Sequence, residues 1–136
     1  DRLYLELTES QIMEDPVGAA AVLSGLAERG IRSMVDDFGT GYSSMSTLLH
    51  VRAAVLKIDR SFVSDLLTSR EADVMVRSMV DLAHNLGMSV VAEGVEDQAT
   101  LDRLTELGCE VAQGFHIARP MPFDQLVGVL GVVCPA

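Results

Sequence analysis

Residues 36–41 read Asp36-Asp37-Phe38-Gly39-Thr40-Gly41, and this stretch is the most informative part of the chain because two adjacent acids end an apolar run. Adjacent carboxylates at a strand end repel each other, and they persist most readily where a cation or strong hydrogen-bond donors compensate them. The two glycines let the backbone turn sharply and let a ligand approach closely. Taken alone, the stretch is also compatible with an ordinary strand-to-helix turn that has an acidic cap.

Apolar runs alternate with helical patterns on both sides of this stretch. Five apolar runs are predicted to be strands, and they cover residues 3–7, 31–35, 54–58, 89–92 and a short part of 109–117. Helical patterns lie between and after them, at residues 15–30, 44–49, 62–67, 71–86, 97–107 and 123–130. Four or five β-α units in succession predict an α/β fold with parallel strands and right-handed crossovers.

Local signals support the two clearest helices. Asp15-Pro16 supplies an N-cap and a first-turn proline, and an apolar stripe that includes Val22 follows it. The apolar positions of 71–86, with Met75 and Met79 among them, fall on one helix face. Both methionines are therefore predicted to fill the core.

Length, charge and cysteine usage exclude several classes of protein. A chain of 136 residues forms at most one domain, and its net charge of −10 argues against a surface that binds DNA or RNA. No apolar stretch reaches the roughly 18 residues of a membrane span, and the first residues do not resemble a secretory signal. Cys109 and Cys134 lack metal-ligand spacing and are predicted to be free thiols. A cytoplasmic location is expected, with any membrane anchor lying in a region outside this sequence.

Polar side chains follow successive predicted strands where each strand ends. In parallel α/β sheets, chemistry collects at the carboxyl ends of the strands. Because random surface charges lie more often on helix faces, this pattern predicts a functional site. The residues in question are Glu6, Asp36, Asp37, Lys57, Glu93 and Gln113.

Each of these residues also has a purely structural interpretation. Glu6 and Glu9 can form a strand-end and helix-start pair, and Lys57 can extend to solvent or pair with Asp59. The acidic pair that follows the fourth strand can flank a glycine turn. None of the three histidines shares metal-ligand spacing with another, so they are predicted not to bind metal.

Five short motifs occur in the order and spacing of the EAL domain, and the resemblance covers essentially the whole chain. They are Glu6-Leu7-Thr8-Glu9, residues 36–44, Leu56-Lys57-Ile58-Asp59, Ala92-Glu93-Gly94-Val95-Glu96 and Gln113-Gly114-Phe115. That family comprises bacterial phosphodiesterases that linearise cyclic di-GMP. The resemblance implies the C-terminal part of a TIM-like (β/α)8 barrel, with about five mainly parallel strands alternating with helices.

The resemblance also implies site residues. Two divalent ions, Mg²⁺ or Mn²⁺, would be bound by Glu6, Asp36, Asp37 and Glu93, with Asp36 bridging them and Glu93 also counted as catalytic. Carboxylate oxygens suit these ions, and a two-metal site can activate water and stabilise charge in phosphodiester hydrolysis. Lys57 would orient the attacking water and stabilise charge, because a lysine among acids keeps a high pKa. Supporting roles would fall to Glu9, Asp59, Glu96 and Gln113, and Gly114 and Phe115 would contact the substrate.

The sequence lacks two upstream features that complete members of the family carry, the Glu-Ala-Leu motif and an Asn on another strand, and no Glu-Ala-Leu tripeptide occurs in it. Residues 1–136 are therefore predicted to be a partial EAL domain, the C-terminal half of the barrel. The expected partners are cyclic di-GMP, the missing upstream half of the barrel, a sensory or diguanylate cyclase domain that precedes it, and a second copy in a homodimer. The fragment alone is expected to be inactive and to expose apolar residues such as Leu5, Val35 and Leu56. The alternative is a non-catalytic regulatory module that binds cyclic di-GMP or dimerises.

Overall fold

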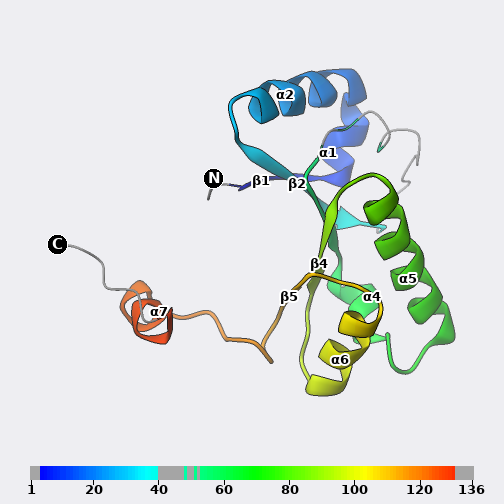
Figure 1. Ribbon diagram of the computed structural model, residues 1–136, viewed down its shortest axis with the longest axis vertical. Coiled ribbons are helices and arrows are strands. Elements are labelled where there is room, and N and C mark those ends of the chain that lie inside the picture. The colour runs from blue at the N-terminus through cyan, green and yellow to red at the C-terminus, as the bar shows by residue number, and fades with distance from the viewer. Residues whose placement is uncertain (1–3, 40–47, 49–50, 52, 131–136) are drawn as a thin grey trace.

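Five parallel strands form one sheet in the order in which they occur along the chain (Figure 1). The computed structural model describes residues 4–39, 48, 51 and 53–130. The strands are β1 (Tyr4–Thr8), β2 (Arg32–Phe38), β3 (Val55–Ile58), β4 (Ser89–Glu93) and β5 (Val111–Gln113). Every neighbouring pair is parallel, which confirms the predicted α/β class with consecutive parallel strands.

Helices connect the strands wherever the structure describes the connection. They are α1 (Glu9–Glu14), α2 (Pro16–Glu28), α4 (Arg60–Ser64), α5 (Arg70–Asn85), α6 (Gln98–Glu106) and α7 (Phe123–Leu130). The predicted helix at 44–49 lies outside the described residues, apart from Leu48. Asp15 caps α2 as predicted, since its carboxylate accepts the Gly18 N–H at 2.9 Å, and Pro16 occupies the first turn.

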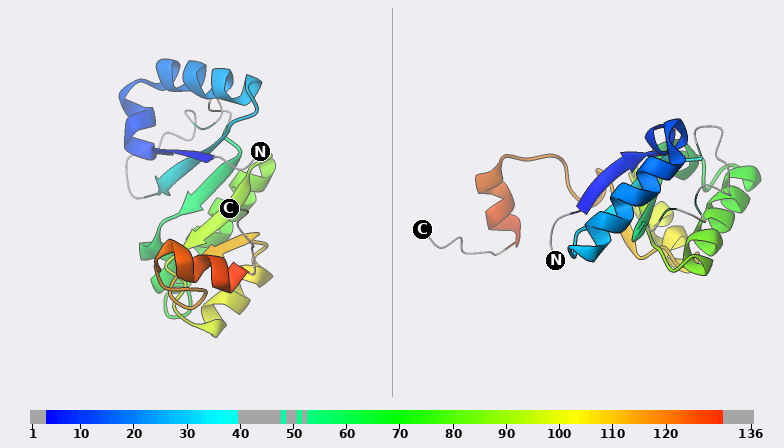
Figure 2. Two further views of the ribbon diagram at one scale, coloured as in Figure 1. Left: turned by 90° about the vertical axis from the view of Figure 1, so that its left-hand side faces the viewer. Right: turned by 90° about the horizontal axis from the view of Figure 1, so that it is seen from above.

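The hydrophobic core lies between the sheet and the helices (Figure 2). Val35 of β2 and Leu56 of β3 are 1% and 0% exposed, and they belong to the same core as Leu23 of α2 and Val76 of α5. The expectation that an open sheet exposes Val35 and Leu56 is therefore wrong, because both side chains pack under helices. Leu5, by contrast, is 37% exposed.

Three details of the sequence-based prediction are wrong. Strand β2 does not end at residue 35 but continues to Phe38, so the two acids are part of it. Met75 is 44% exposed although Met79 is buried, because only one side of α5 faces the sheet. Val22 is 58% exposed, since α2 is apolar around most of its circumference and only part of that surface reaches the core.

Helix α7 stands apart from the sheet at the end of an extended segment (Figures 1 and 2). The predicted helix at 123–130 is confirmed, and Phe123, Leu126 and Val129 are exposed on it. Within the described part of the chain, none of the helices combines the length and apolar character that a membrane crossing requires.

Candidate active site

Side chains from four adjacent strands meet at the carboxyl end of the sheet. The Lys57 Nζ atom lies 3.1 Å from Glu6 Oε2, 2.9 Å from Asp36 Oδ1 and 2.8 Å from Glu93 Oε1. These residues belong to β3, β1, β2 and β4 respectively, so the parallel pairing brings together positions that lie up to 87 residues apart, from 6 to 93. We call Glu6, Asp36, Lys57 and Glu93 the strand-end cluster.

The lysine of this cluster is nearly inaccessible to solvent. Its side chain is 7% exposed, whereas those of Asp36 and Glu93 are 20% and 22% exposed and that of Glu6 is 49% exposed. Burial by itself would lower the pKa of Lys57, but hydrogen bonds to Glu93, Asp36 and Glu6 outweigh it and raise the pKa above its ordinary value. The Lys57 side chain is therefore a protonated donor at neutral pH, which is poorly suited to remove a proton.

The two adjacent acids occupy an irregular part of β2. The register between β2 and β3 shifts between Val35 and Phe38, as at a β-bulge. Asp37 has a φ of 54°, in the left-handed region that aspartate enters more readily than most residues, and its N–H donates to Asp36 Oδ1 at 3.0 Å. The bulge departs from strict strand alternation, so the two neighbouring carboxylates need not point to opposite faces of the sheet.

Glu9 fastens the backbone that follows β2. Its Oε2 atom accepts the Gly39 N–H at 2.9 Å, and the residue is 6% exposed. Its other oxygen, Oε1, is buried without a hydrogen-bond partner in the described residues. Glu9 therefore contacts the start of the segment that it was predicted to support, while residues 40–44 of that segment lie outside the described residues.

Asp59 does not pair with Lys57, so that structural alternative is wrong. Its Oδ1 atom accepts the Ser61 N–H at 2.9 Å and the Ser61 hydroxyl at 2.6 Å, which caps the start of α4. The Ser61 hydroxyl is the main cause of a lowered pKa at Asp59. Asp59 therefore fixes the turn that follows β3, two residues beyond Lys57.

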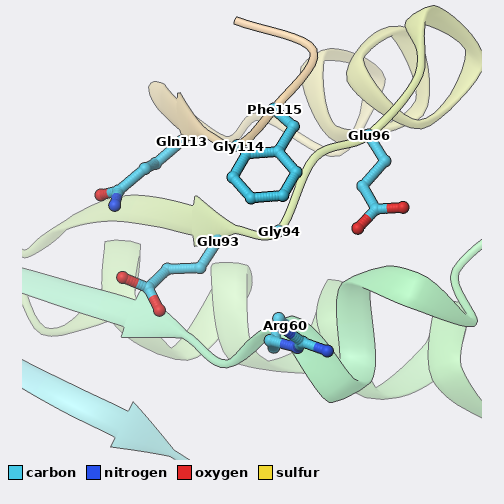
Figure 3. A pocket seen from close by; sticks show the side chains of 7 residues that line it. All are labelled: Arg60, Glu93, Gly94, Glu96, Gln113, Gly114 and Phe115. Carbon is cyan, nitrogen blue, oxygen red and sulfur yellow. The ribbon is translucent and has the colours of Figure 1, made fainter. Parts of the chain in front are cut away.

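A pocket of about 190 Å³ adjoins the strand-end cluster and shares Glu93 with it (Figure 3). It is lined by Arg60, Glu93, Gly94, Glu96, Gln113, Gly114 and Phe115. The structure thus brings the predicted residues Glu96, Gln113, Gly114 and Phe115 into one pocket. The sequence analysis did not predict Arg60 as a site residue. The available signal was its position directly after the third strand and next to Asp59, which caps α4.

Gly114 lets β5 and the segment after β4 cross closely. A Cβ atom at Gly114 would collide with the backbone of Val95. The two segments are joined there by backbone hydrogen bonds, from Val95 N–H to Gln113 O at 3.1 Å and from His116 N–H to Val95 O at 3.0 Å. Gly114 therefore holds the Gln113 end of β5 beside the Glu93 end of β4, where the two residues are register partners.

The donor set can be compared with what a divalent cation requires. The strands carry four carboxylates near the site, those of Glu6, Asp36, Asp37 and Glu93. Their oxygen atoms suit Mg²⁺ or Mn²⁺ better than Zn²⁺. Their present arrangement is nevertheless that of an ion-pair cluster around Lys57, and no group of three or more His, Cys, Asp or Glu in the described residues is placed to hold a metal. The oxygen ligands therefore fit Mg²⁺ or Mn²⁺ in chemical type. A complete ligand set requires a different arrangement of these side chains and further ligands.

Comparison with known protein families assigns the chain. The family model described as "EAL domain" matches residues 1–120 of the 136. The chain belongs to the EAL domain family. This assignment agrees with the expectation drawn from the five motifs, although the Glu-Ala-Leu tripeptide is absent from the sequence.

Two relatives in Pseudomonas aeruginosa illustrate how this EAL chain relates to longer proteins. It is 43% identical over 125 residues to the bifunctional diguanylate cyclase/cyclic di-GMP phosphodiesterase MucR, covering 92% of this chain and 18% of MucR. It is 41% identical over 124 residues to the cyclic di-GMP phosphodiesterase PA2567, covering 91% of this chain and 21% of PA2567. The chain thus spans about a fifth of the length of these curated relatives.

Solved EAL structures confirm the fold class. The c-di-GMP complex of the PaMucR phosphodiesterase superposes with a TM-score of 0.86 at 44% identity, covering 91% of this chain and 50% of that chain. The EAL domain of Mycobacterium smegmatis DcpA gives a TM-score of 0.87 at 38% identity, covering 94% and 57%. The five parallel strands with their helices therefore match part of an EAL TIM barrel.

Proposed function

We propose that the protein containing this chain hydrolyses cyclic di-GMP to the linear dinucleotide. The convergence of three carboxylates from three strands on the buried Lys57 ammonium is the observation that carries the proposal. Burying a charge is costly, and solvent-exposed ion pairs contribute little to stability. A buried ammonium that three carboxylates share at the carboxyl ends of parallel strands is therefore better explained by a catalytic role than by a stabilising role. The phosphodiesterase names of MucR and PA2567 agree with it.

Lys57 supplies a fixed positive charge in this proposal. Its raised pKa keeps Lys57 protonated near neutral pH, and its low exposure limits competition from bulk water. The ammonium faces three carboxylates in this structure, so the proposal requires that one of them release its N–H donor when it binds a metal ion. It can hold the oxygen of an attacking water or of the phosphodiester. Hydrolysis adds that water to phosphorus and breaks one P–O bond, and the leaving oxygen ends as a hydroxyl group. Lys57 thus orients and stabilises charge, and it does not act as the general base.

The carboxylates at the strand ends are the proposed metal ligands. Glu6 and Asp36 would hold one ion, and Asp36, Asp37 and Glu93 a second. When bound, Mg²⁺ or Mn²⁺ would lower the pKa of water and neutralise charge on the phosphoryl oxygens. Metal binding would require the carboxylates to be shared between Lys57 and the ions. The bulge at Asp37 matters in this proposal because it breaks strict strand alternation, so that the Asp37 carboxylate could serve the same site as Asp36.

The remaining parts of the proposed site come from outside this chain. Residues 1–136 are proposed to form the C-terminal part of an EAL barrel, in which an upstream half completes the ligand set. The coverage of 50% of the PaMucR phosphodiesterase chain supports this division. A homodimer, and an additional sensory or diguanylate cyclase domain, belong to the same proposal.

Asp36→Asn in the full-length protein tests the assignment. With Mg²⁺ or Mn²⁺ present, we expect the native protein to linearise cyclic di-GMP and the variant to lose about 100-fold or more in kcat, because one carboxylate serves both proposed ions and Lys57. Product formation is followed by chromatography. The matched control is Asp65→Asn, an exposed acid at the end of α4, which should leave the rate within about twofold of the native protein.

Two outcomes would contradict the proposal. Near-normal turnover in Asp36→Asn would remove Asp36 from the site. Tight binding of cyclic di-GMP by the native protein without any hydrolysis would instead favour the non-catalytic regulatory module.

A further inference from the structure

His116 lies directly after the part of the pocket wall that residues 113–115 form, and its side chain reaches a neighbouring helix. The ring atom Nε2 is 3.1 Å from Oε1 of Gln98, the first residue of α6. The Gln98 Nε2 atom donates to Asp102 Oδ1 at 2.7 Å, one helical turn further along α6. We call Asp102, Gln98 and His116 the α6 bridge, because they join α6 to the segment that follows β5.

The direction of each hydrogen bond in the α6 bridge follows from its acidic end. An ionised carboxylate can only accept, so the NH₂ group of Gln98 faces Asp102 and its carbonyl oxygen faces the imidazole. The His116 ring must therefore carry a proton on Nε2 and donate it. Gln98 lies in a fixed first turn, because Asp97 caps α6 by accepting the Thr100 N–H at 2.7 Å and Thr100 is buried.

Backbone contacts place His116 where two segments of the pocket wall cross. Its N–H donates to Val95 O at 3.0 Å, and the Val95 N–H donates to Gln113 O at 3.1 Å. Between these two bonds lies Gly114, where a Cβ atom would collide with the Val95 backbone. The position of His116 is therefore coupled to that of the pocket wall that precedes it.

Side-chain contacts that would hold this segment are few. Within the part of the chain that the structure describes, the bond from His116 is the one side-chain hydrogen bond that connects residues 114–122 to another element. The Arg119 guanidinium lies 4.6 Å from the centroid of the Phe115 ring, but both residues belong to the segment itself. The segment leads to α7, which stands apart from the sheet (Figure 1). The α6 bridge is therefore the polar side-chain anchor of this part of the pocket wall.

We propose that His116 is a positioning residue that holds residues 113–115 in the orientation that binds the substrate. This inference rests on the proposed function, because these residues belong to the proposed site. His116 does not line the pocket, and it lies on none of the strands that carry the strand-end cluster. Its replacement should therefore weaken substrate binding and leave the bond-breaking step nearly unchanged.

Hydrogen–deuterium exchange of the full-length protein without ligand tests the anchor directly. We expect His116→Leu to speed exchange of the amides of residues 114–118 about fivefold, because one neutral hydrogen bond between exposed groups is lost. His116→Gln should restore most of the protection, since its NH₂ group can take the place of Nε2, and the shorter His116→Asn should not. His84→Leu, in the last turn of α5, is the matched histidine control and should leave these amides unchanged.

Binding and turnover of cyclic di-GMP by the full-length protein test the consequence for the site. We expect His116→Leu to raise KM about fivefold with kcat within about twofold, and to raise the Kd in calorimetry with EDTA by the same factor. His116→Gln should recover most of the loss, and His84→Leu should behave as the native protein does. Gln98→Leu should match His116→Leu, and the double variant should be no worse than either, because both changes remove the same bond.

Each outcome supports the proposal or contradicts it. Unchanged exchange in His116→Leu would overturn the anchor. Faster exchange with unchanged KM and Kd, or additive effects of the Gln98 and His116 changes, would overturn the positioning role. In a native protein that binds cyclic di-GMP without hydrolysing it, a weaker Kd for His116→Leu would support the role of His116 and contradict the phosphodiesterase. A native protein that neither binds nor hydrolyses cyclic di-GMP would contradict both proposals.

Discussion

At each end of the sheet, carboxylate oxygens contact the nitrogen atom of a side chain, but the two contacts differ in burial and in the number of carboxylates. At the carboxyl end, three carboxylates share the Lys57 ammonium, whose side chain is 7% exposed. At the amino end, Glu110 accepts the Val90 N–H at 2.8 Å through Oε2 and lies 2.9 Å from His84 Nε2 through Oε1, with both side chains at least 40% exposed.

Under the proposed function, the carboxyl end of the sheet carries the chemistry and the amino end supports the fold. Glu110 satisfies a backbone donor at the start of β4 and links the end of α5 to β5, so its contacts explain its presence. Three carboxylates around one buried ammonium exceed what local structure requires. In parallel barrels, function concentrates at the carboxyl ends of the strands and stability at the amino ends, and the two contacts follow that division.

The largest expected effect is that of Lys57→Met in the full-length protein. We expect kcat for cyclic di-GMP to fall about 100-fold, because a preorganised charge is lost, while Mn²⁺ affinity stays within a few-fold. Lys57 is the only lysine among the 136 residues, so no other ammonium of this chain can replace it. Activity assays and calorimetric Mn²⁺ titration measure the two quantities.

The corresponding change at the amino end, Glu110→Gln, should leave kcat within about twofold. A large drop in Mn²⁺ affinity for Lys57→Met would contradict the separation of Lys57 from metal binding. A large loss of activity for Glu110→Gln would contradict the contrast between the two ends of the sheet.

An intermediate effect is expected for the bulge residue Asp37. Asp37→Val should lower the free energy of unfolding by about 1–2 kcal/mol relative to Asp37→Gly, because a β-branched residue is strained at a φ of 54° and glycine is not. Urea denaturation of both variants measures the difference. If the two variants unfolded at the same urea concentration, the left-handed conformation of Asp37 would be wrong.

The smallest effect is expected on the free energy of unfolding when Glu110 is replaced. Glu110→Gln should lower the free energy of unfolding by about 0.5–1 kcal/mol at pH 7, because a charged acceptor for the Val90 N–H becomes neutral while the side chain stays partly solvated. Thermal denaturation at pH 7 measures it. His84→Gln is the companion change, and it should cost less because it leaves the backbone hydrogen bond intact.

This last effect also has a defined pH dependence. Burial by itself would raise the pKa of Glu110, but hydrogen bonds from the Val90 N–H and the proximity of His84 lower it below its ordinary 4.5. A carboxylate with a lowered pKa in the folded state stabilises the protein above its ordinary pKa and loses that contribution as the pH falls. The difference between Glu110→Gln and the native protein should therefore shrink below pH 4.5. A difference that grew on acidification would contradict the contact.

Sequence reasoning predicted the order of strands and helices, the α2 cap at Asp15 and the polar strand ends, because these depend on short-range periodicity and capping chemistry. The five described strands and the α5 and α6 helices lie near their predicted positions. The prediction failed where distant segments decide the outcome: Met75 was assigned to the core and is exposed, and β2 was ended before its two acids.

The sequence by itself determined the fold class and the polar side chains near the carboxyl ends of the strands, because apolar and polar residues alternate over short stretches of the chain. Only the tertiary structure decided which carboxylates share Lys57, that Asp37 adopts a left-handed bulge, that Arg60 enters the pocket and that Arg119 covers Phe115. The shared lysine depends on the register between strands that are separated by tens of residues, and a shift of one residue would turn each strand side chain to the other face of the sheet. Arg60 and Arg119 lie outside the strands, and the turns that follow β3 and β5 decide their positions.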